Sequence, residues 1–190
     1  MTPILGIMAS QISGHLSPSS DYESIATATI TSNTQQITFS SIPQTYTHLQ
    51  LRSMTRNNRA VTVDGLCIWF NGDFSSNLSP YTANIMYDAN GTQGSVYLTS
   101  DSRFSETAGS TQTANYYGVA VTDILNYTNT NMKKSARAFT ALNINGSAWL
   151  YYFSTFYNST SAITSITLNN GGTTDSFITG TKIALYGLKG

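Results

Sequence analysis

Apolar and polar residues alternate in short stretches along most of this chain, from residue 23 onward. Leu49 and Leu51, for example, alternate with polar neighbours, and a period of two places every second side chain on the same face of a β-strand. These stretches are rich in Thr, Ile, Val, Tyr and Phe and are separated by Gly, Asn, Asp and Ser, which is typical of strands and turns. The pattern predicts strands over 23–30, 36–39, 47–54, 65–71, 83–88, 95–100, 116–125, 135–144, 148–157, 162–169 and 181–188.

The connections between these stretches predict antiparallel strands. Asn-Gly pairs lie in 88–94 and 143–147, and this pair suits the positive backbone angles of tight hairpins. No amphipathic helix of ordinary length stands between the strands, as it would in βαβ units. We therefore expect an all-β fold, an antiparallel jelly-roll-like β-sandwich.

The beginning of the chain does not follow the strand pattern. Residues 2–16 (TPILGIMASQISGHL) are interrupted by Pro and Gly, and the stretch 17–21 (SPSSD) separates them from the first strand. The sequence predicts an extended N-terminal arm, residues 1–21, and one β-sandwich domain, residues 22–190.

The arm lacks the features of a targeting segment or a membrane anchor. The first basic residue is Arg52, so the charged region that precedes the apolar core of a signal peptide is missing. Its unbroken apolar run, 3–9, is far shorter than the roughly 20 residues of a membrane span. Because free termini are seldom ordered unless they are tied down, we expect the arm to dock on a neighbouring protein, with its own sandwich as the alternative. The predicted assembly residues are Ile4, Leu5, Ile7, Met8 and Ile12.

Composition narrows the classes of partner. Charged residues make up 9% of the chain, against about 25% in an average globular protein. Nine basic and nine acidic residues cancel, and the longest basic cluster is the pair 133–134, so nucleic-acid binding is not expected. A chain without net charge has little electrostatic repulsion between copies, which favours a part of an assembly.

Residues that could carry chemistry are few and scattered. His15, His48 and Cys67 do not stand at metal-ligand spacing, and no calcium loop is present. Two carboxylates could meet in space as a glycosidase pair, which keeps a polysaccharide-degrading enzyme as an alternative. Ordinary turn roles explain most acidic residues better, Asp64 and Asp175 among them. The sequence thus predicts no catalytic, cofactor or metal site, and no enzyme.

The aromatic stretch 148–157 (AWLYYFSTFY) leaves three interpretations open. On a strand, Trp149 and Tyr151 share one face and Leu150 and Tyr152 the other, so both faces are apolar. The second face could lie under a loop or the arm, form a subunit interface, or stack on sugar rings. The candidate glycan or subunit contacts are Trp69, Trp149 and Tyr151.

Several stretches are distinctive as a set. They are ILGIMASQISG (4–14), ITFSSIPQTYTHLQLRSMTRNN (37–58), FNGD (70–73), YYGVAVTDILNYTNTNMKKSARAFTA (116–141), AITSITL (162–168) and KIALYGLKG (182–190). Together they resemble a family of small virion proteins encoded by tailed bacteriophages, over nearly the whole chain. The matching motifs are strand and turn patterns and carry no catalytic signature.

The resemblance implies a structural protein of the virion, exposed on the particle surface. Its partners would be other capsid or tail proteins, and a homo-oligomer is expected, since trimers are common in such families. Within this class we expect a capsid decoration or cement protein anchored through its N-terminal arm. The alternative is a tail, baseplate or fibre protein that binds a surface glycan during host attachment.

Overall fold

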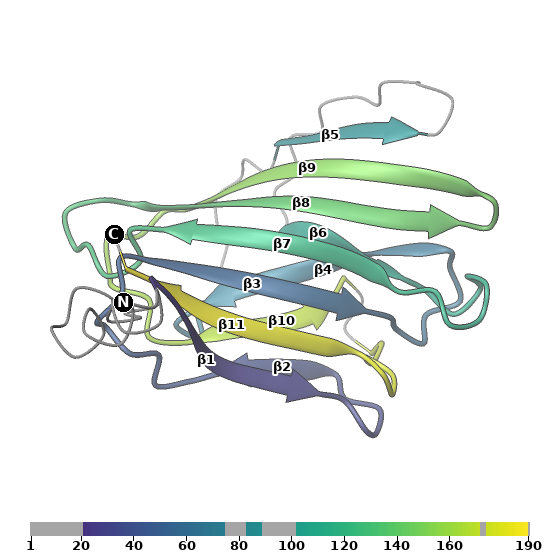
Figure 1. Ribbon diagram of the computed structural model, residues 1–190, viewed down its shortest axis with the longest axis horizontal. Helices are drawn as coiled ribbons and strands as arrows, with labels where there is room; N and C mark the ends of the chain where they lie inside the picture. The colour runs from purple at the N-terminus through teal and green to yellow at the C-terminus, as the bar shows by residue number, and fades with distance from the viewer. Residues whose placement is uncertain (1–20, 75–82, 89–101, 172–173, 190) are drawn as a thin grey trace, which may run out of the picture.

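The computed structural model describes residues 21–74, 83–88, 102–171 and 174–189 and has eleven β-strands (Figure 1). The strands are β1 (Tyr22–Thr29), β2 (Gln36–Phe39), β3 (His48–Thr55), β4 (Val63–Phe70), β5 (Ala83–Asp88), β6 (Arg103–Ala108), β7 (Gly118–Leu125), β8 (Lys134–Ile144), β9 (Ser147–Tyr157), β10 (Ile166–Asn170) and β11 (Lys182–Leu188). The described ranges contain no helix, which confirms the all-β prediction. No helix in these ranges therefore has the length and apolar character of a membrane span.

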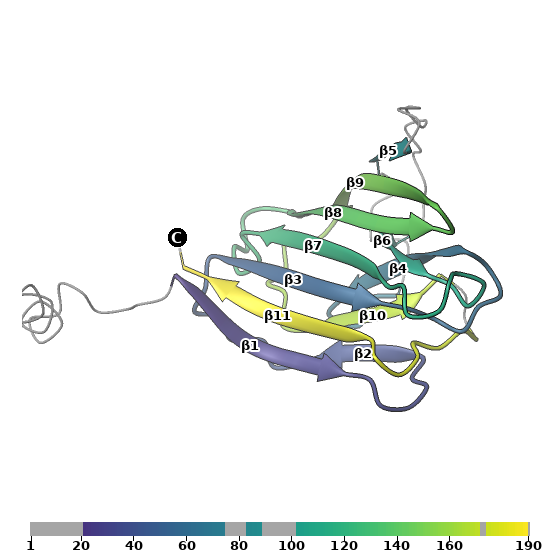
Figure 2. The ribbon, with the colours of Figure 1, turned by 45° about the vertical axis from the view of Figure 1, so that its right-hand side comes forward.

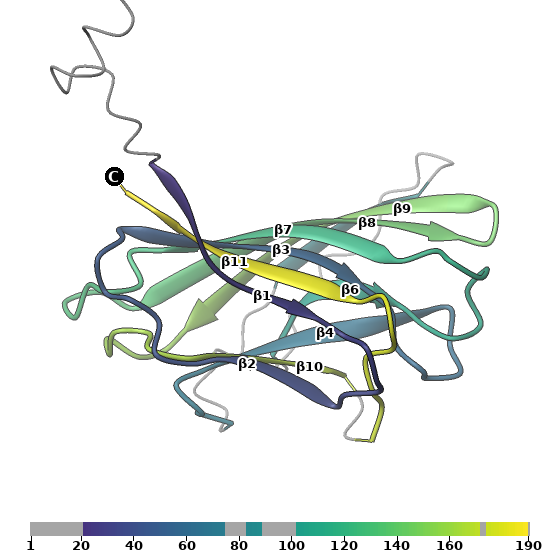
Figure 3. The same cartoon turned by 60° about the horizontal axis from the view of Figure 1, so that its bottom comes forward.

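The strands form two antiparallel sheets. The large sheet has seven strands in the order β1-β11-β3-β7-β8-β9-β5, and the small sheet has four in the order β2-β10-β4-β6. Figure 3 shows β2, β10 and β4 beneath the large sheet. The last two strands in the chain lie inside the sheets, because β11 pairs with both β1 and β3 while β10 pairs with both β2 and β4.

One hydrophobic core lies between the two sheets. The predicted alternation holds on β3, where Leu49 and Leu51 are buried. On β11, Ile183 and Leu185 also face the core. A hydrogen bond between the hydroxyls of Ser105 on β6 and Thr140 on β8, at 2.8 Å, joins the two sheets directly.

Asn-Gly pairs make the tight turns where the structure describes them. Asn145 and Gly146 have φ angles of 50° and 101° and connect β8 to β9, which confirms the hairpin predicted over 143–147. Asn71 and Gly72, with φ angles of 56° and 67°, end β4 in the same way. The pair predicted to turn within 88–94 lies outside the described residues.

Strand β6 was not expected from the sequence, and the predicted strand 95–100 lies outside the described residues. Residues 103–108 (RFSETA) carry few large apolar side chains, because hydroxyls such as that of Ser105 face the core instead. A β-bulge opposite Leu66 and Cys67 further obscures the period of two. The strand predicted over 162–169 begins only at Ile166.

The predicted N-terminal arm, residues 1–21, lies outside the described residues except for Asp21. With it lie the five predicted assembly residues Ile4, Leu5, Ile7, Met8 and Ile12. The Asp21 carbonyl accepts a hydrogen bond of 2.9 Å from the Lys189 amide, so the two ends of the described chain lie side by side (Figure 2).

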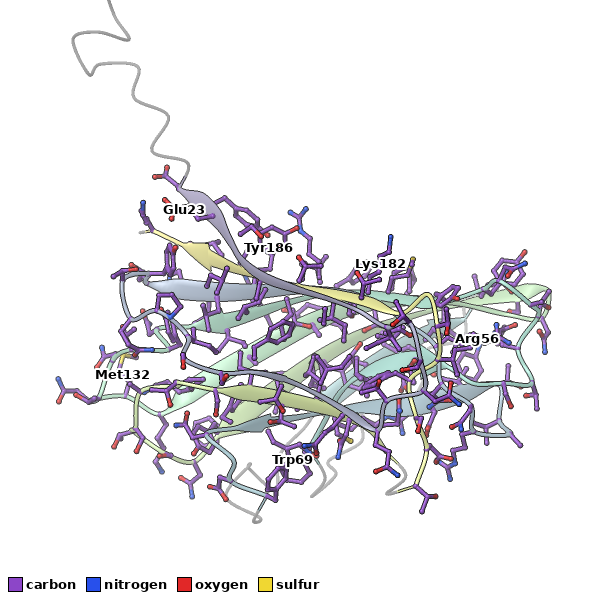
Figure 4. The ribbon with its side chains drawn as sticks, turned by 90° about the horizontal axis from the view of Figure 1, so that it is seen from below. Glu23, Arg56, Trp69, Met132, Lys182 and Tyr186 are labelled. Atoms are coloured by element: carbon purple, nitrogen blue, oxygen red, sulfur yellow. The ribbon has the colours of Figure 1, made fainter. Side chains whose placement is uncertain are left out.

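Two buried cations hold loops at opposite ends of the sheets. The Arg56 guanidinium donates to the carbonyl oxygens of Ser110, Gln112, Thr113 and Tyr116, at 2.7 to 3.3 Å. The fully buried Lys134 ammonium donates to the carbonyls of Asn129, Met132 and Thr160. Figure 4 labels Arg56 at one end of the molecule and Met132 at the other. Each cation is thus compensated by backbone dipoles, which makes it a structural clamp.

Candidate functional site

Strands β7 and β8 carry large apolar side chains on both faces. On the outer face Val119, Val121 and Phe139 are exposed beside the polar Asp123 and Arg137. The inner face carries the small or polar Ala120, Thr122, Ala138 and Thr140 and the larger Ile124 and Leu142. A solvated sheet face normally carries mostly polar side chains. This part of the outer face is therefore more apolar than a solvated sheet face usually is.

The outward residues continue across β9 as one contiguous surface. Val121, Phe139 and Tyr152 lie side by side in one row across the strands, and Val119 and Leu150 flank Ala141 in the next row. We call Val119, Val121, Phe139, Leu150 and Tyr152 the apolar patch. Each is between 41% and 52% exposed, and together they present on the order of 400 Å² of surface. The largest apolar patch on a monomeric protein commonly has about this size and is often functional.

A band of paired polar side chains borders the apolar patch. Asp123 accepts hydrogen bonds from Gln50 at 2.8 Å and from Arg137 at 3.2 Å. The Gln50 carbonyl oxygen in turn accepts from Arg52 at 3.1 Å and from the Tyr22 hydroxyl. We call these five residues the polar band. Because its members hydrogen-bond one another, part of their hydrogen-bonding capacity is already used within this face.

The predicted aromatic contacts Trp149 and Tyr151 lie together in a cleft at the edge of the two sheets. Their rings meet edge to face, with centroids 5.8 Å apart, and Tyr151 stacks on Phe153 on the inner face of β9. The cleft has a volume of about 520 Å³ and is also lined by Arg103 and Asn145. We call it the edge cleft. Its size suits a small ligand, since such sites commonly measure about 300–1,000 Å³.

The electrostatics of the edge cleft favour a neutral ligand. Burial raises the pKa of Tyr151, and the nearby Glu106 carboxylate raises it further, so the phenol keeps its proton at physiological pH. Arg103 forms an ion pair with the buried Glu106. The described residues that line the cleft include no carboxylate, so they do not supply the two acidic groups of a glycosidase. Stacking and hydrogen bonding are the chemistry that these residues offer.

The raised pKa of Tyr151 predicts a loss of stability at alkaline pH. The folded protein holds this proton at pH values where the unfolded chain has lost it, so stability falls as the pH rises through about 10. Tyr151 alone contributes a loss of about 1.4 kcal/mol between pH 9 and pH 11. Urea unfolding at pH 9, 10 and 11 should show a shallower decline for Tyr151→Phe than for the unchanged protein. An equal decline of the free energy of unfolding in both proteins would contradict the raised pKa of Tyr151.

Trp69 does not join the other two predicted aromatics. It lies on the small sheet, where its indole N–H donates to the Asn169 side chain at 3.2 Å and its ring contacts Phe74. Figure 4 shows Trp69 on one outer side of the molecule and Lys182 and Tyr186 on the other. The structure therefore brings Trp149 and Tyr151 together and leaves Trp69 apart.

The other candidate residues have structural surroundings. His48 accepts a hydrogen bond from the Asn126 amide at 3.0 Å, and Cys67 is buried on β4. Asp64 is not a turn residue as predicted, because it lies within β4 and accepts hydrogen bonds from Asn57 and Arg59. Within the described ranges, no group of three or more His, Cys, Asp or Glu side chains could hold a metal ion.

Sequence reasoning missed Val119, Val121 and Phe139 as surface residues. A signal was present, because Val121 and Asp123 stand two apart on one strand, as do Arg137 and Phe139 on the next. Charged residues mark the solvent side of a strand, so their neighbours at a spacing of two share that side. The same alternation places Leu150 and Tyr152 outward on β9.

No known family model, no curated protein and no solved structure matches the chain. Its function is therefore inferred from its own residues and geometry.

Proposed function

We propose that this chain is a non-enzymatic structural protein of a tailed-phage particle, a decoration or cement protein of the capsid surface. The observation that carries the proposal is the apolar patch on the outer face of the large sheet, where Val121 and Phe139 of β7 and β8 are exposed. Burial of apolar surface is the main favourable term in protein association. The exposed residues of the apolar patch add to that term only when another molecule covers them.

The order of the strands supports a jelly-roll-like β-sandwich, a fold that viral capsid proteins use. Strands β1, β11, β3 and β7 form one four-stranded group, and β2, β10, β4 and β6 form the other. Along the chain, these eight strands pass from one group to the other at every step except β4 to β6. In this proposal β8, β9 and β5 extend the first group, and β8 and β9 carry part of the apolar patch.

Charge and surface chemistry also suit a part of a particle. The chain has no net charge, and we carry forward the expected resemblance of its strand and turn motifs to small virion proteins as part of this proposal. We propose that residues 1–21 anchor the β-sandwich, residues 22–190, to the virion. The apolar residues of this segment, Ile4 and Leu5 among them, would be buried on a partner there.

Association with the particle tests this proposal. Phage particles purified on a density gradient should contain the chain, and antibody labelling should place it on the head. Deletion of residues 2–16 should leave a protein with an unchanged circular dichroism spectrum that no longer binds the particle. A chain that stays in the lysate and never sediments with particles would overturn the proposal. Labelling on the tail would replace the cement role with a tail or fibre role.

The edge cleft favours a second candidate function, glycan binding during host attachment. Trp149 and Tyr151 offer aromatic surface, and Arg103 and Asn145 offer polar groups around it. A glycan array probed with the full chain would show saturable binding that Trp149→Ala abolishes. The urea midpoint of that variant is the control for folding. Binding that survives the substitution would exclude this cleft as the glycan site.

A further inference from the structure

The outer face of the large sheet contains an apolar hollow within the apolar patch. A depression of about 270 Å³ has mostly apolar walls, formed by Val119, Val121, Phe139 and Ala141, and is also lined by Arg52 and Ser53. A cavity of about 150 Å³ holds a benzene ring, so the hollow has room for one or two aliphatic side chains. A second flat sheet laid over this face would leave the depression empty, whereas a segment with protruding aliphatic side chains would fill it.

The chain has one segment outside the described residues with that chemistry at its N-terminus. Residues 3–12 (PILGIMASQI) carry Ile4, Leu5, Ile7, Met8 and Ile12, and no charged side chain occurs between Met1 and Asp21. We propose that residues 3–12 of one copy bind in the hollow on the outer face of a second copy. This inference rests on the proposed assembly function: the partner that buries the arm in the particle is a neighbouring copy of the chain.

The polar band makes the hollow suitable for an uncharged peptide. Arg137 and Gln50 already donate to Asp123, and Arg52 lies over the rings of Tyr22 and Tyr186 at 5.1 and 5.3 Å. These charges are therefore engaged within their own face. A peptide without charges needs no new ion pair and would contact mainly the apolar walls of the hollow.

The position of β1 favours the arm of another copy over that of the same chain. The hollow lies level with the C-terminal end of β1. One row across the sheet shows this, because it joins Thr29 of β1, Lys182 of β11, Met54 of β3 and Val119 of β7. The arm joins β1 at the opposite end, at Tyr22, and β1 runs from there toward the hollow. An arm that kept the direction of β1 would lead away from the hollow of its own chain. Twenty extended residues span about 66–72 Å, which is enough to reach a neighbouring molecule.

Cross-linking between two full-length chains tests the inference. Both chains carry Cys67→Ala, which removes the single cysteine. One also carries Ile7→Cys, and the other, with a size tag, carries Val121→Cys. A short bis-maleimide should link the two upon mixing, with a yield at least tenfold above that of a tagged Ser135→Cys control. Ser135 is also exposed on the outer face, on β8, but lies outside the hollow.

Two further measurements keep the test decisive. First, an excess of a synthetic peptide of residues 2–16 should suppress the cross-link between residues 7 and 121. Second, full-length Val121→Lys should weaken self-association at least tenfold in sedimentation velocity. The control Ser135→Lys should leave self-association unchanged. Equal yields at residues 121 and 135 would overturn the inference. So would a chain carrying both Ile7→Cys and Val121→Cys that links only to itself. Particle binding that persists in either case would leave the proposed function standing.

Discussion

Replacing Arg56 with Ala should lower the free energy of unfolding by about 3–5 kcal/mol, because four backbone carbonyls lose a charged donor in the protein interior. The Arg56 side chain is only 7% exposed, so water replaces these bonds incompletely. Arg56→Lys should recover little, since one ammonium cannot reproduce the fork of a guanidinium. Urea unfolding followed by circular dichroism measures the loss.

Arg137→Ala is the matched control for this experiment. Arg137 pairs with Asp123 on the surface and is 56% exposed, so its removal should cost at most about 1 kcal/mol. Limited proteolysis adds a local measurement: Arg56→Ala should become sensitive to cleavage within 110–116, whereas Arg137→Ala should not. Equal losses of stability in the two variants would contradict the role of Arg56 in holding the loop over residues 110–116.

Phe153→Ala should destabilise the protein by about 3–5 kcal/mol, as truncation of a fully buried phenylalanine usually does. Phe153 lies on the inner face of β9, with its ring 5.6 Å from that of Tyr151. The neighbouring side chain, Tyr152, points to the opposite face and is 44% exposed.

Tyr152→Ala therefore removes a ring of similar size from the same strand without opening a cavity in the core. We expect a loss of about 1 kcal/mol or less for this variant in the same urea titration. If Tyr152→Ala cost as much as Phe153→Ala, the assignment of inner and outer faces on β9 would be wrong.

Local signals were enough to predict most strands. The alternation at Leu49 and Leu51 fixed which face of β3 is buried, and the pair Asn145–Gly146 marked a hairpin, because only a few residue types adopt its backbone angles readily. Strand β6 was not predicted because the alternation of apolar and polar residues depends on large apolar side chains. In β6, hydrogen bonding in the interior, as between Ser105 and Thr140, takes their place.

The candidate surfaces were only partly predictable. The shared face of Trp149 and Tyr151 follows from strand periodicity and is confirmed, while their role in binding stays a prediction. The edge cleft brings Trp149 next to Arg103, which is far away in the sequence, and that proximity depends on the packing of the two sheets. The apolar patch likewise depends on the register of β7 and β8.

The interior positions of β10 and β11 have a consequence for biosynthesis. Strands β1 and β3 have no direct pairing with each other and are joined through β11, just as β2 and β4 are joined through β10. Neither sheet can complete its strand pairing while residues 166–188 are still untranslated. The nascent polypeptide therefore emerges with unpaired strand edges, which are prone to aggregation, and its cooperative folding waits for late, long-range pairing.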